Sequence, residues 1–359
     1  MNSQFHRRDF LKLMGLSSAA AGLSQPLSRK IPSKRYNVLF ILTDDQRFDT
    51  IHGLGNEQAI TPNVDHLVQE GTVFSNAYIM GGTSGAVCMP SRAMILSGRN
   101  LFSLKNRGET IPQEHVMLGE AFRRAGYTTC GIGKWHNGTQ AYARCFTTGG
   151  PILFRGMSDQ YNPPLMDFDE TGVYDHAKTY LAQDRPDLKG KHSSEIYTDA
   201  ALEFLRQQPK EVPFFLYLAL QSPHDPRTAP PDFHALFNPE AIPTPDAFLP
   251  EHPFRIGDDR VRDELLAPYP RTPEIVRRHT ADYLAMISHD DHQMGRIMSL
   301  LKERGLYEKT IIVITGDNGL ALGRHGLFGK QNVYDHSVHV PLILAGPGIS
   351  RGKRNDALC

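Results

Sequence analysis

The stretch from Cys88 to Arg92 places a nucleophilic side chain beside a predicted helix start. Pro90 suits the first turn of a helix, because the N–H that proline lacks has no partner there in any case. We therefore expect Cys88 to lie just before a helix, where backbone N–H groups and the helix dipole favour negative charge. That position suits a nucleophile that attacks an anionic ester. A small cysteine buried under the helix fits the spacing as well, and this is the commoner role of cysteine.

Acidic and amide side chains follow two predicted buried strands. Asp44 and Asp45 end one apolar run, and Asp317 and Asn318 end another. Ligands of open α/β sheets gather at the carboxyl ends of strands, so the two pairs can converge on one divalent cation. Oxygen ligands with one neutral amide favour calcium or magnesium over zinc, and the sequence does not separate those two. Taken alone, the aspartate pair is more commonly a solvated turn, since such pairs are frequent in loops.

Basic side chains follow the remaining predicted strands. Lys134 and His136 lie two residues apart, His224 follows a third apolar run, and Lys330 follows a glycine. A lysine suits a sulfate or phosphate oxygen, and an imidazole can move a proton near neutral pH. Without further context, an exposed lysine, a packed histidine and a turn histidine are the commoner interpretations.

The motifs, taken together, resemble those of the type I sulfatases. The residues that carry the resemblance are Cys88-Met89-Pro90-Ser91-Arg92, Leu96-Ser97-Gly98-Arg99, Gly133-Lys134-Trp135-His136, Pro223-His224 and Gly316-Asp317-Asn318-Gly319. They occur in the order of that family, and the resemblance covers roughly residues 36–350.

This resemblance implies a nucleophile and a metal site. In the family the cysteine is oxidised by a formylglycine-generating enzyme, and the hydrate of formylglycine is the nucleophile. Asp44, Asp45, Asp317 and Asn318 would bind the ion, usually calcium, with the oxygen derived from Cys88 close to it.

It also implies roles for the basic residues. Arg92 would hold the nucleophile region, and Lys134 and Lys330 would bind the sulfate. His224 would protonate the leaving oxygen, and His136 would assist breakdown of the intermediate.

The predicted fold is an α/β sandwich with a mixed, mainly parallel sheet and helices on both faces. Apolar runs alternate with amphipathic segments, which is typical of this class. The expected strands are residues 36–43, 72–78, 127–132, 213–220, 310–315 and 340–344, and the expected helices are residues 61–71, 117–125, 194–207 and 272–305. The resemblance places this sandwich in the alkaline-phosphatase-like superfamily.

Two segments lack clear periodicity. Residues 139–193 and 226–273 are expected to be loops that shape a substrate pocket. Within the long predicted helix, the run from His289 to His292 resembles a metal cluster at first sight. We expect it instead on the helix surface and among supporting polar groups, because neighbouring helical side chains diverge.

The first thirty residues resemble a twin-arginine export signal. Arg7 and Arg8 precede a mildly apolar run that contains small residues, although a basic, unstructured terminus is the alternative. The expected domains are therefore a signal at residues 1–30 and a catalytic domain at residues 31–359. We expect export by the twin-arginine machinery to the periplasm or medium, with Cys88 oxidised beforehand. The family's C-terminal subdomain is expected to be missing.

The composition excludes several classes of function. Of the 359 residues, 39 are basic and 39 acidic, so no overall field attracts nucleic acid. No apolar run is long enough for a stable membrane span, and four cysteines are too few for a disulfide scaffold. The predicted function is hydrolysis of sulfate esters, with a sulfated carbohydrate favoured by analogy. The alternatives are a phosphonate or phosphate ester hydrolase and an inactive truncated remnant.

Overall fold

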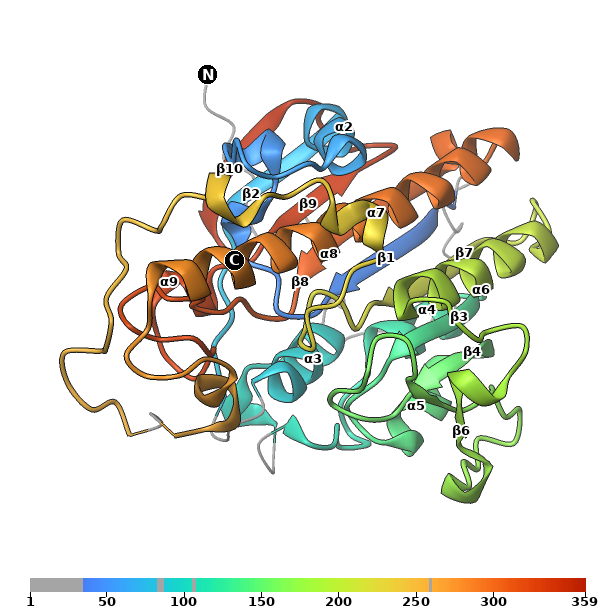
Figure 1. Ribbon diagram of the computed structural model, residues 1–359. Helices are drawn as coiled ribbons and strands as arrows, with labels where there is room; N and C mark the ends of the chain where they lie inside the picture. Colours follow the sequence, from blue (N-terminus) through green and yellow to red (C-terminus); the bar gives the residue numbers. More distant parts are fainter. Residues whose placement is uncertain (1–34, 83–86, 105–107, 258–259) are drawn as a thin grey trace, which may run out of the picture.

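A mixed eight-stranded sheet runs through the computed structural model, which describes residues 35–82, 87–104, 108–257 and 260–359 (Figure 1). Across the sheet the strands are β10 (Lys353–Leu358), β2 (Gly71–Asn76), β9 (Leu342–Ala345), β8 (Thr310–Gly316), β1 (Asn37–Thr43), β7 (Phe214–Ala219), β3 (Thr128–Lys134) and β4 (Thr148–Leu153). A separate small sheet pairs β5 (Pro164–Leu165) with β6 (Tyr180–Leu181).

The central strands are parallel. β8, β1, β7, β3 and β4 run in one direction, whereas β9 is antiparallel to both β8 and β2. The carboxyl ends of five neighbouring strands therefore lie at one edge of the sheet. The predicted mixed, mainly parallel sheet is confirmed.

Helices cover both faces of the sheet (Figure 1). They are α2 (Pro62–Glu70), α3 (Cys88–Ser97), α4 (Leu118–Arg124), α5 (Thr139–Cys145), α6 (Ser193–Gln207), α7 (Pro231–His234), α8 (Pro273–Glu303) and α9 (Asp335–Val338). In β1, Leu39 and Ile41 pack with α2, α6 and α8, while Val38, Phe40 and Leu42 pack with α3, α4 and α5. Alternate strand residues point to opposite faces, so this continuous apolar strand serves two cores.

The expectation that residues 139–193 form only loops is wrong. They contain α5, β4, β5 and β6. β4 pairs with β3 at the sheet edge, where a Cβ on Gly149 would lie 2.2 Å from the carbonyl oxygen of Gly131. Glycine is a weak strand former, so the local pattern hides a strand that this close backbone approach requires. The described part of residues 226–273 is mostly irregular, with α7 and two 3₁₀ helices, Pro239–Ala241 and Arg262–Leu266.

The polar run on α8 is also placed differently from the expectation. His289, Asp290 and Asp291 are buried, and only His292 of the run is exposed. Asp291 accepts hydrogen bonds from the backbone N–H of Val64 at 2.7 Å and from Asn63 Nδ2 at 2.8 Å. It therefore caps the start of α2. α8 lies between α2 and α6, so side chains that point sideways meet other helices and not solvent.

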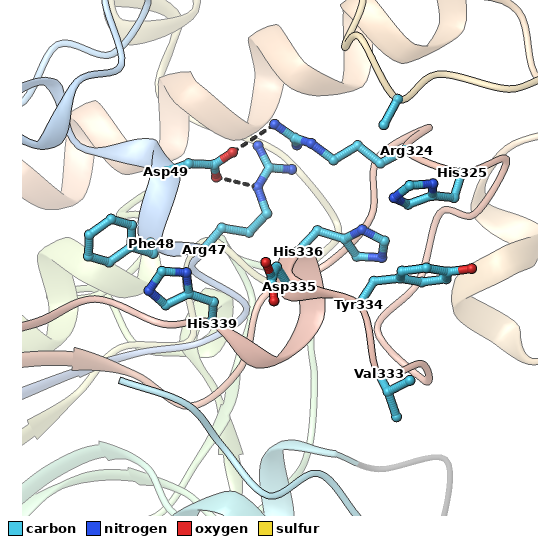
Figure 2. A pocket seen from close by; sticks show the side chains of 11 residues that line it. Arg47, Phe48, Asp49, Arg324, His325, Val333, Tyr334, Asp335, His336 and His339 are labelled. Carbon is cyan, nitrogen blue, oxygen red and sulfur yellow. Dashed lines mark hydrogen bonds and ion pairs between the residues drawn. The ribbon is translucent and has the colours of Figure 1, made fainter. Parts of the chain in front are cut away.

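A cavity of about 470 Å³ opens beside the loop that follows β1 (Figure 2). Arg47 and Arg324 both bind Asp49 there, and the rings of His325 and Tyr334 stack 4.3 Å apart. Its lining includes none of the residues predicted to do chemistry.

The predicted signal at residues 1–30 lies outside the described residues. Among the helices that are described, none is both long and apolar enough to cross a bilayer.

Candidate active site

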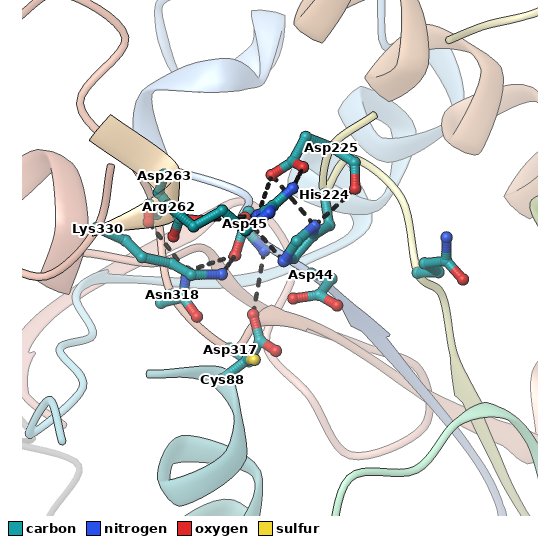
Figure 3. Close-up of polar contacts among 12 residues, drawn as sticks. Asp44, Asp45, Cys88, His224, Asp225, Arg262, Asp263, Asp317, Asn318 and Lys330 are labelled. Atoms are coloured by element: carbon teal, nitrogen blue, oxygen red, sulfur yellow. Dashed lines mark hydrogen bonds and ion pairs between the residues drawn. The ribbon is translucent and has the colours of Figure 1, made fainter. Parts of the chain in front are cut away.

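Side chains from four adjacent strands and one helix meet at the carboxyl edge of the sheet (Figure 3). Asp44 and Asp45 follow β1, Lys134 ends β3, His224 follows β7, Asp317 and Asn318 follow β8, and Cys88 opens α3. Lys330 reaches the same group from a later loop, and Arg92 and His136 contact it from α3 and from the turn after β3. The structure thus brings together all ten residues that the sequence singled out.

The carboxylates form a buried group suited to a hard cation. Within the part of the chain that is described, Asp44 Oδ1 and Asn318 Oδ1 are buried and have no hydrogen-bond partner. Asn318 donates through Nδ2 to Asp45 Oδ1 at 2.7 Å, which leaves its oxygen free. Ligand atoms of Asp44, Cys88 and Asp317 lie within 4.8 Å of one another. Buried oxygens without partners are costly, and calcium or magnesium is the ligand that such an oxygen set fits.

The backbone that carries these carboxylates is held in an unusual conformation. Asp45 has a φ of 68°, in the left-handed region that non-glycine residues rarely enter. Its N–H donates to Asp317 Oδ1 at 3.1 Å, and the Tyr283 hydroxyl donates to its carbonyl oxygen at 2.5 Å. Strain of this kind, held by several contacts, is typical of functional sites.

Three buried cations face the three carboxylates. Arg92 binds Asp317 at 2.8 Å, Lys134 forms an ion pair with Asp44, and Lys330 binds Asp45 at 2.5 Å. Buried charges persist only when they are compensated in this way. A divalent cation bound by the carboxylates would free Lys134 and Lys330 to pair with an anion.

The pKa values of the carboxyls reflect their neighbours. Burial alone would raise the pKa of Asp45, but His224, Lys330 and Lys134 outweigh it and the pKa is lowered. Burial and the charge of Asp44 raise the pKa of Asp317 to about 6, although Arg92 opposes this. A divalent cation would relieve the repulsion between these acids.

Cys88 is the first residue of α3, not the residue before the helix as expected. Its side chain is 3% exposed, and Sγ lies 3.4 Å from His136 Nδ1 and 3.9 Å from Lys134 Nζ. Burial raises the pKa of the thiol despite the two nearby lysines, Lys134 and Lys330. The thiol is therefore a poor nucleophile as it stands, since the thiolate is the reactive form.

The two histidines have different surroundings. Burial and the charge of Lys134 lower the pKa of His136 to about 2, so its ring is neutral and can accept a proton. His224 Nδ1 lies 2.8 Å from the carbonyl oxygen of Asp225, and Nε2 lies 3.8 Å from Asp45 Oδ2. Nδ1–H therefore donates to that carbonyl oxygen, and Nε2, which faces the reaction centre, carries a proton when the ring is the imidazolium.

Asp225 and Arg262 belong to the site and were not predicted. Arg262 forms an ion pair with Asp225, whose carboxylate lies 3.4 Å from His224 Nδ1 (Figure 3). Asp225 could have been suspected from its place next to His224. Arg262 lies in the irregular segment, where no local pattern marks it.

The sequence profile of the Sulfatase family matches residues 36–359. The chain belongs to the sulfatase family. This sulfatase is 27% identical to the N-acetylglucosamine-6-O-sulfatase of Bacteroides thetaiotaomicron, over 97% of the chain and 69% of that protein. It is 28% identical to the iduronate 2-sulfatase of Homo sapiens, over 93% of the chain and 64% of that protein. The chain thus spans less than two thirds of the length of the second relative.

Further comparisons support the fold of this sulfatase. The multifunctional alkaline phosphatase superfamily protein PehA of Trinickia caryophylli is 30% identical over 88% of the chain and 69% of its own length. A structure solved in complex with its substrate D-glucosamine-2-N,6-O-disulfate superimposes with a TM-score of 0.71 at 24% identity, over 90% of this chain and 74% of that one. The phosphonate monoester hydrolase of Agrobacterium radiobacter gives 0.69 at 23% identity, over 90% and 71%.

Proposed function

We propose that the protein hydrolyses sulfate esters of a sulfated carbohydrate, with formylglycine derived from Cys88 as the nucleophile. One observation carries the proposal: the buried, unpartnered oxygens of Asp44 and Asn318 lie in the same cluster as Cys88 and two lysines. The cluster offers a place for a cation, a nucleophile and an anion at once.

Two groups would complete the site. When bound, a calcium ion would be held by Asp44, Asp45, Asp317 and Asn318 and would polarise the sulfate. Oxidation of Cys88 to formylglycine would supply an aldehyde, whose hydrate is a nucleophile that the buried thiol is not. Magnesium could take the place of calcium in such an oxygen site.

The chain's own residues would bind the substrate and move its protons. Lys134 and Lys330 neutralise the sulfate oxygens as negative charge shifts toward the leaving group. His224, as the imidazolium, delivers the proton on Nε2 to the leaving oxygen and becomes a neutral ring that keeps its Nδ1–H. His136, which is neutral, accepts a proton through Nδ1 from the hydroxyl that remains at position 88, so that sulfate can depart.

A carbohydrate sulfate is the favoured substrate. The first relative is named for removal of a 6-O-sulfate from N-acetylglucosamine, and the second for a 2-sulfate of iduronate. A phosphonate or phosphate ester is the second candidate, because PehA is described as multifunctional within the superfamily. We further propose twin-arginine export to the periplasm or medium, after a formylglycine-generating enzyme has acted on Cys88.

The first test is mass spectrometry of the peptide that contains Cys88, from protein co-produced with a formylglycine-generating enzyme. We expect an aldehyde oxygen in place of the thiol. The same protein should hydrolyse 4-nitrophenyl sulfate and 6-O-sulfated N-acetylglucosamine faster than phenylphosphonate esters, with Cys88→Ala as the inactive control. Faster phosphonate turnover would favour the second candidate. An unmodified thiol with calcium binding but no turnover would favour the inactive remnant.

A further inference from the structure

The 3₁₀ helix Arg262–Leu266 lies beside the active site and contacts two of its segments (Figure 3). Arg262 binds Asp225, next to His224. Asp263 accepts a hydrogen bond from Gln331, next to Lys330, at 2.8 Å. This helix belongs to the segment that the sequence suggested would only shape a substrate pocket.

The helix is itself firmly held. The Glu264 carboxylate accepts from the backbone N–H groups of Phe328 and Gly329 at 2.9 and 2.7 Å, and pairs with the buried Arg271 at 2.7 Å. Charge-assisted hydrogen bonds of this kind are among the strongest in proteins. The backbone of Arg262 therefore has a fixed position relative to the loop of Lys330.

Through Arg262 this helix reaches the turn of His224. Both terminal nitrogens of Arg262 face the Asp225 carboxylate, whose side chain is only 6% exposed. The carbonyl oxygen of Asp225 is 2.8 Å from His224 Nδ1. On the opposite side, Gln160 Nε2 donates to the carbonyl oxygen of His224 at 2.8 Å. The imidazole is thus held by its ring nitrogen and by its own backbone.

We propose that Asp225 and Arg262 are positioning residues, which form an ion pair that orients His224 so that Nε2 delivers a proton to the leaving oxygen. The inference rests on the proposed function of His224. Proton delivery matters most for a poor leaving group, such as a sugar alkoxide, and little for nitrophenolate. A displacement of about 1 Å at a catalytic group can lower a rate roughly 100-fold.

The test is a double-mutant cycle with Asp225→Asn, Arg262→Met and both changes together. On a sugar sulfate we expect each single variant to lose roughly 10- to 100-fold in kcat with little change in KM. On 4-nitrophenyl sulfate the loss should stay below about threefold, since that leaving group needs no proton. The double variant should lose no more than either single variant, because the residues act as one pair.

Arg185→Met is the matched control, because Arg185 forms an exposed ion pair with Asp187. It should leave both rates unchanged, and thermal unfolding should verify that every variant folds. Arg262 is 44% exposed, so its replacement leaves the core intact.

A second measurement does not depend on turnover. In ¹⁵N-histidine-labelled protein, with His224→Gln used for assignment, the wild-type ring should show a hydrogen-bonded Nδ1–H, and Arg262→Met should speed its exchange with water. If the wild-type protein has no sulfatase activity, only the proposed function is refuted. The ring signal of His224 would then show whether Arg262 and Asp225 position this histidine. Equal losses on both substrates, losses confined to KM, or an unchanged ring signal would overturn the inference.

Discussion

Asp290 should make the protein less stable as the pH rises from 4 to 7. The residue is 2% exposed on α8, and it accepts a hydrogen bond from Ser194 Oγ at 2.6 Å. Its second oxygen, Oδ2, has no hydrogen-bond partner among the residues that the structure describes. Burial raises the pKa of this carboxyl from its ordinary value of 3.8 to about 6. The folded state therefore binds a proton that the unfolded state releases.

The sign and the size follow from linkage. Below pH 3.8 the carboxyl is protonated in the folded and the unfolded state, and its full contribution to the free energy of unfolding is present. As the pH rises through the folded pKa of about 6, that contribution is lost. The difference between the two pKa values corresponds to about 3 kcal/mol of unfolding free energy. The variant Asp290→Asn keeps an acceptor for Ser194 and carries no charge.

Urea unfolding of wild type and Asp290→Asn between pH 4 and 7 measures this effect. We expect the two proteins to be similar near pH 4 and the variant to be more stable by about 2–3 kcal/mol at pH 7. Asp246→Asn, at an exposed carboxyl, should show no such trend. A stability difference that does not change with pH, or a wild type that is the more stable at pH 7, would refute the reasoning.

Four further outcomes are expected. Arg92→Met should lower the unfolding free energy by about 3–5 kcal/mol, because it leaves Asp317 and Asp44 buried without this cation. Asp291→Ala should cost about 1–2 kcal/mol by removing the cap of α2. Gly319→Ala should abolish calcium binding, because its Cβ would lie 2.2 Å from the carbonyl oxygen of His336 and displace the adjacent Asn318. Calcium at 100 times its Kd should stabilise the wild type by about 2.7 kcal/mol.

The measurements for these four are chemical unfolding and calcium titration. Asn318→Ala should weaken the calcium effect without distorting the backbone, and a chelator should reverse it in the wild type. Arg92→Met at wild-type stability would mean that the lysines alone compensate the carboxylates. If hydrogen exchange of α2 is the same in Asp291→Ala as in the wild type, the capping prediction is wrong. If Gly319→Ala binds calcium with wild-type affinity, the prediction for Gly319 is wrong. A melting temperature that calcium does not change would contradict the predicted stabilisation by calcium.

The parallel strands and the composition of the site could be predicted from local patterns. β1, β7 and β8 are mostly apolar runs, and a charged side chain lies at or shortly after the end of each of these strands and of β3, as at Asp44, Lys134, His224 and Asp317. Because parallel strands end at the same edge of a sheet, side chains that follow the ends of different strands are expected to lie close to one another. The motifs that resemble those of the sulfatases contain these same residues.

The antiparallel direction of β9 and the edge pairing of β4 were not visible in the sequence. β9 reads as another buried strand, and only its contacts with β8 and β2 make it antiparallel. β4 carries two glycines and a proline, so its strand conformation comes from pairing with β3. Such pairing is a property of two segments and leaves no periodic signal in either.

The same limit applies to the groups that support the site. Asp290 and Asp291 look like the polar face of a helix, yet α2 and α6 cover them. Arg262 pairs with Asp225 across 37 residues of chain, from a segment without periodicity. Local sequence specifies which side chains can carry charge or donate hydrogen bonds. Which charged side chains form ion pairs depends on how helices and loops pack. A buried ion pair is stable only when both partners are buried in contact with each other.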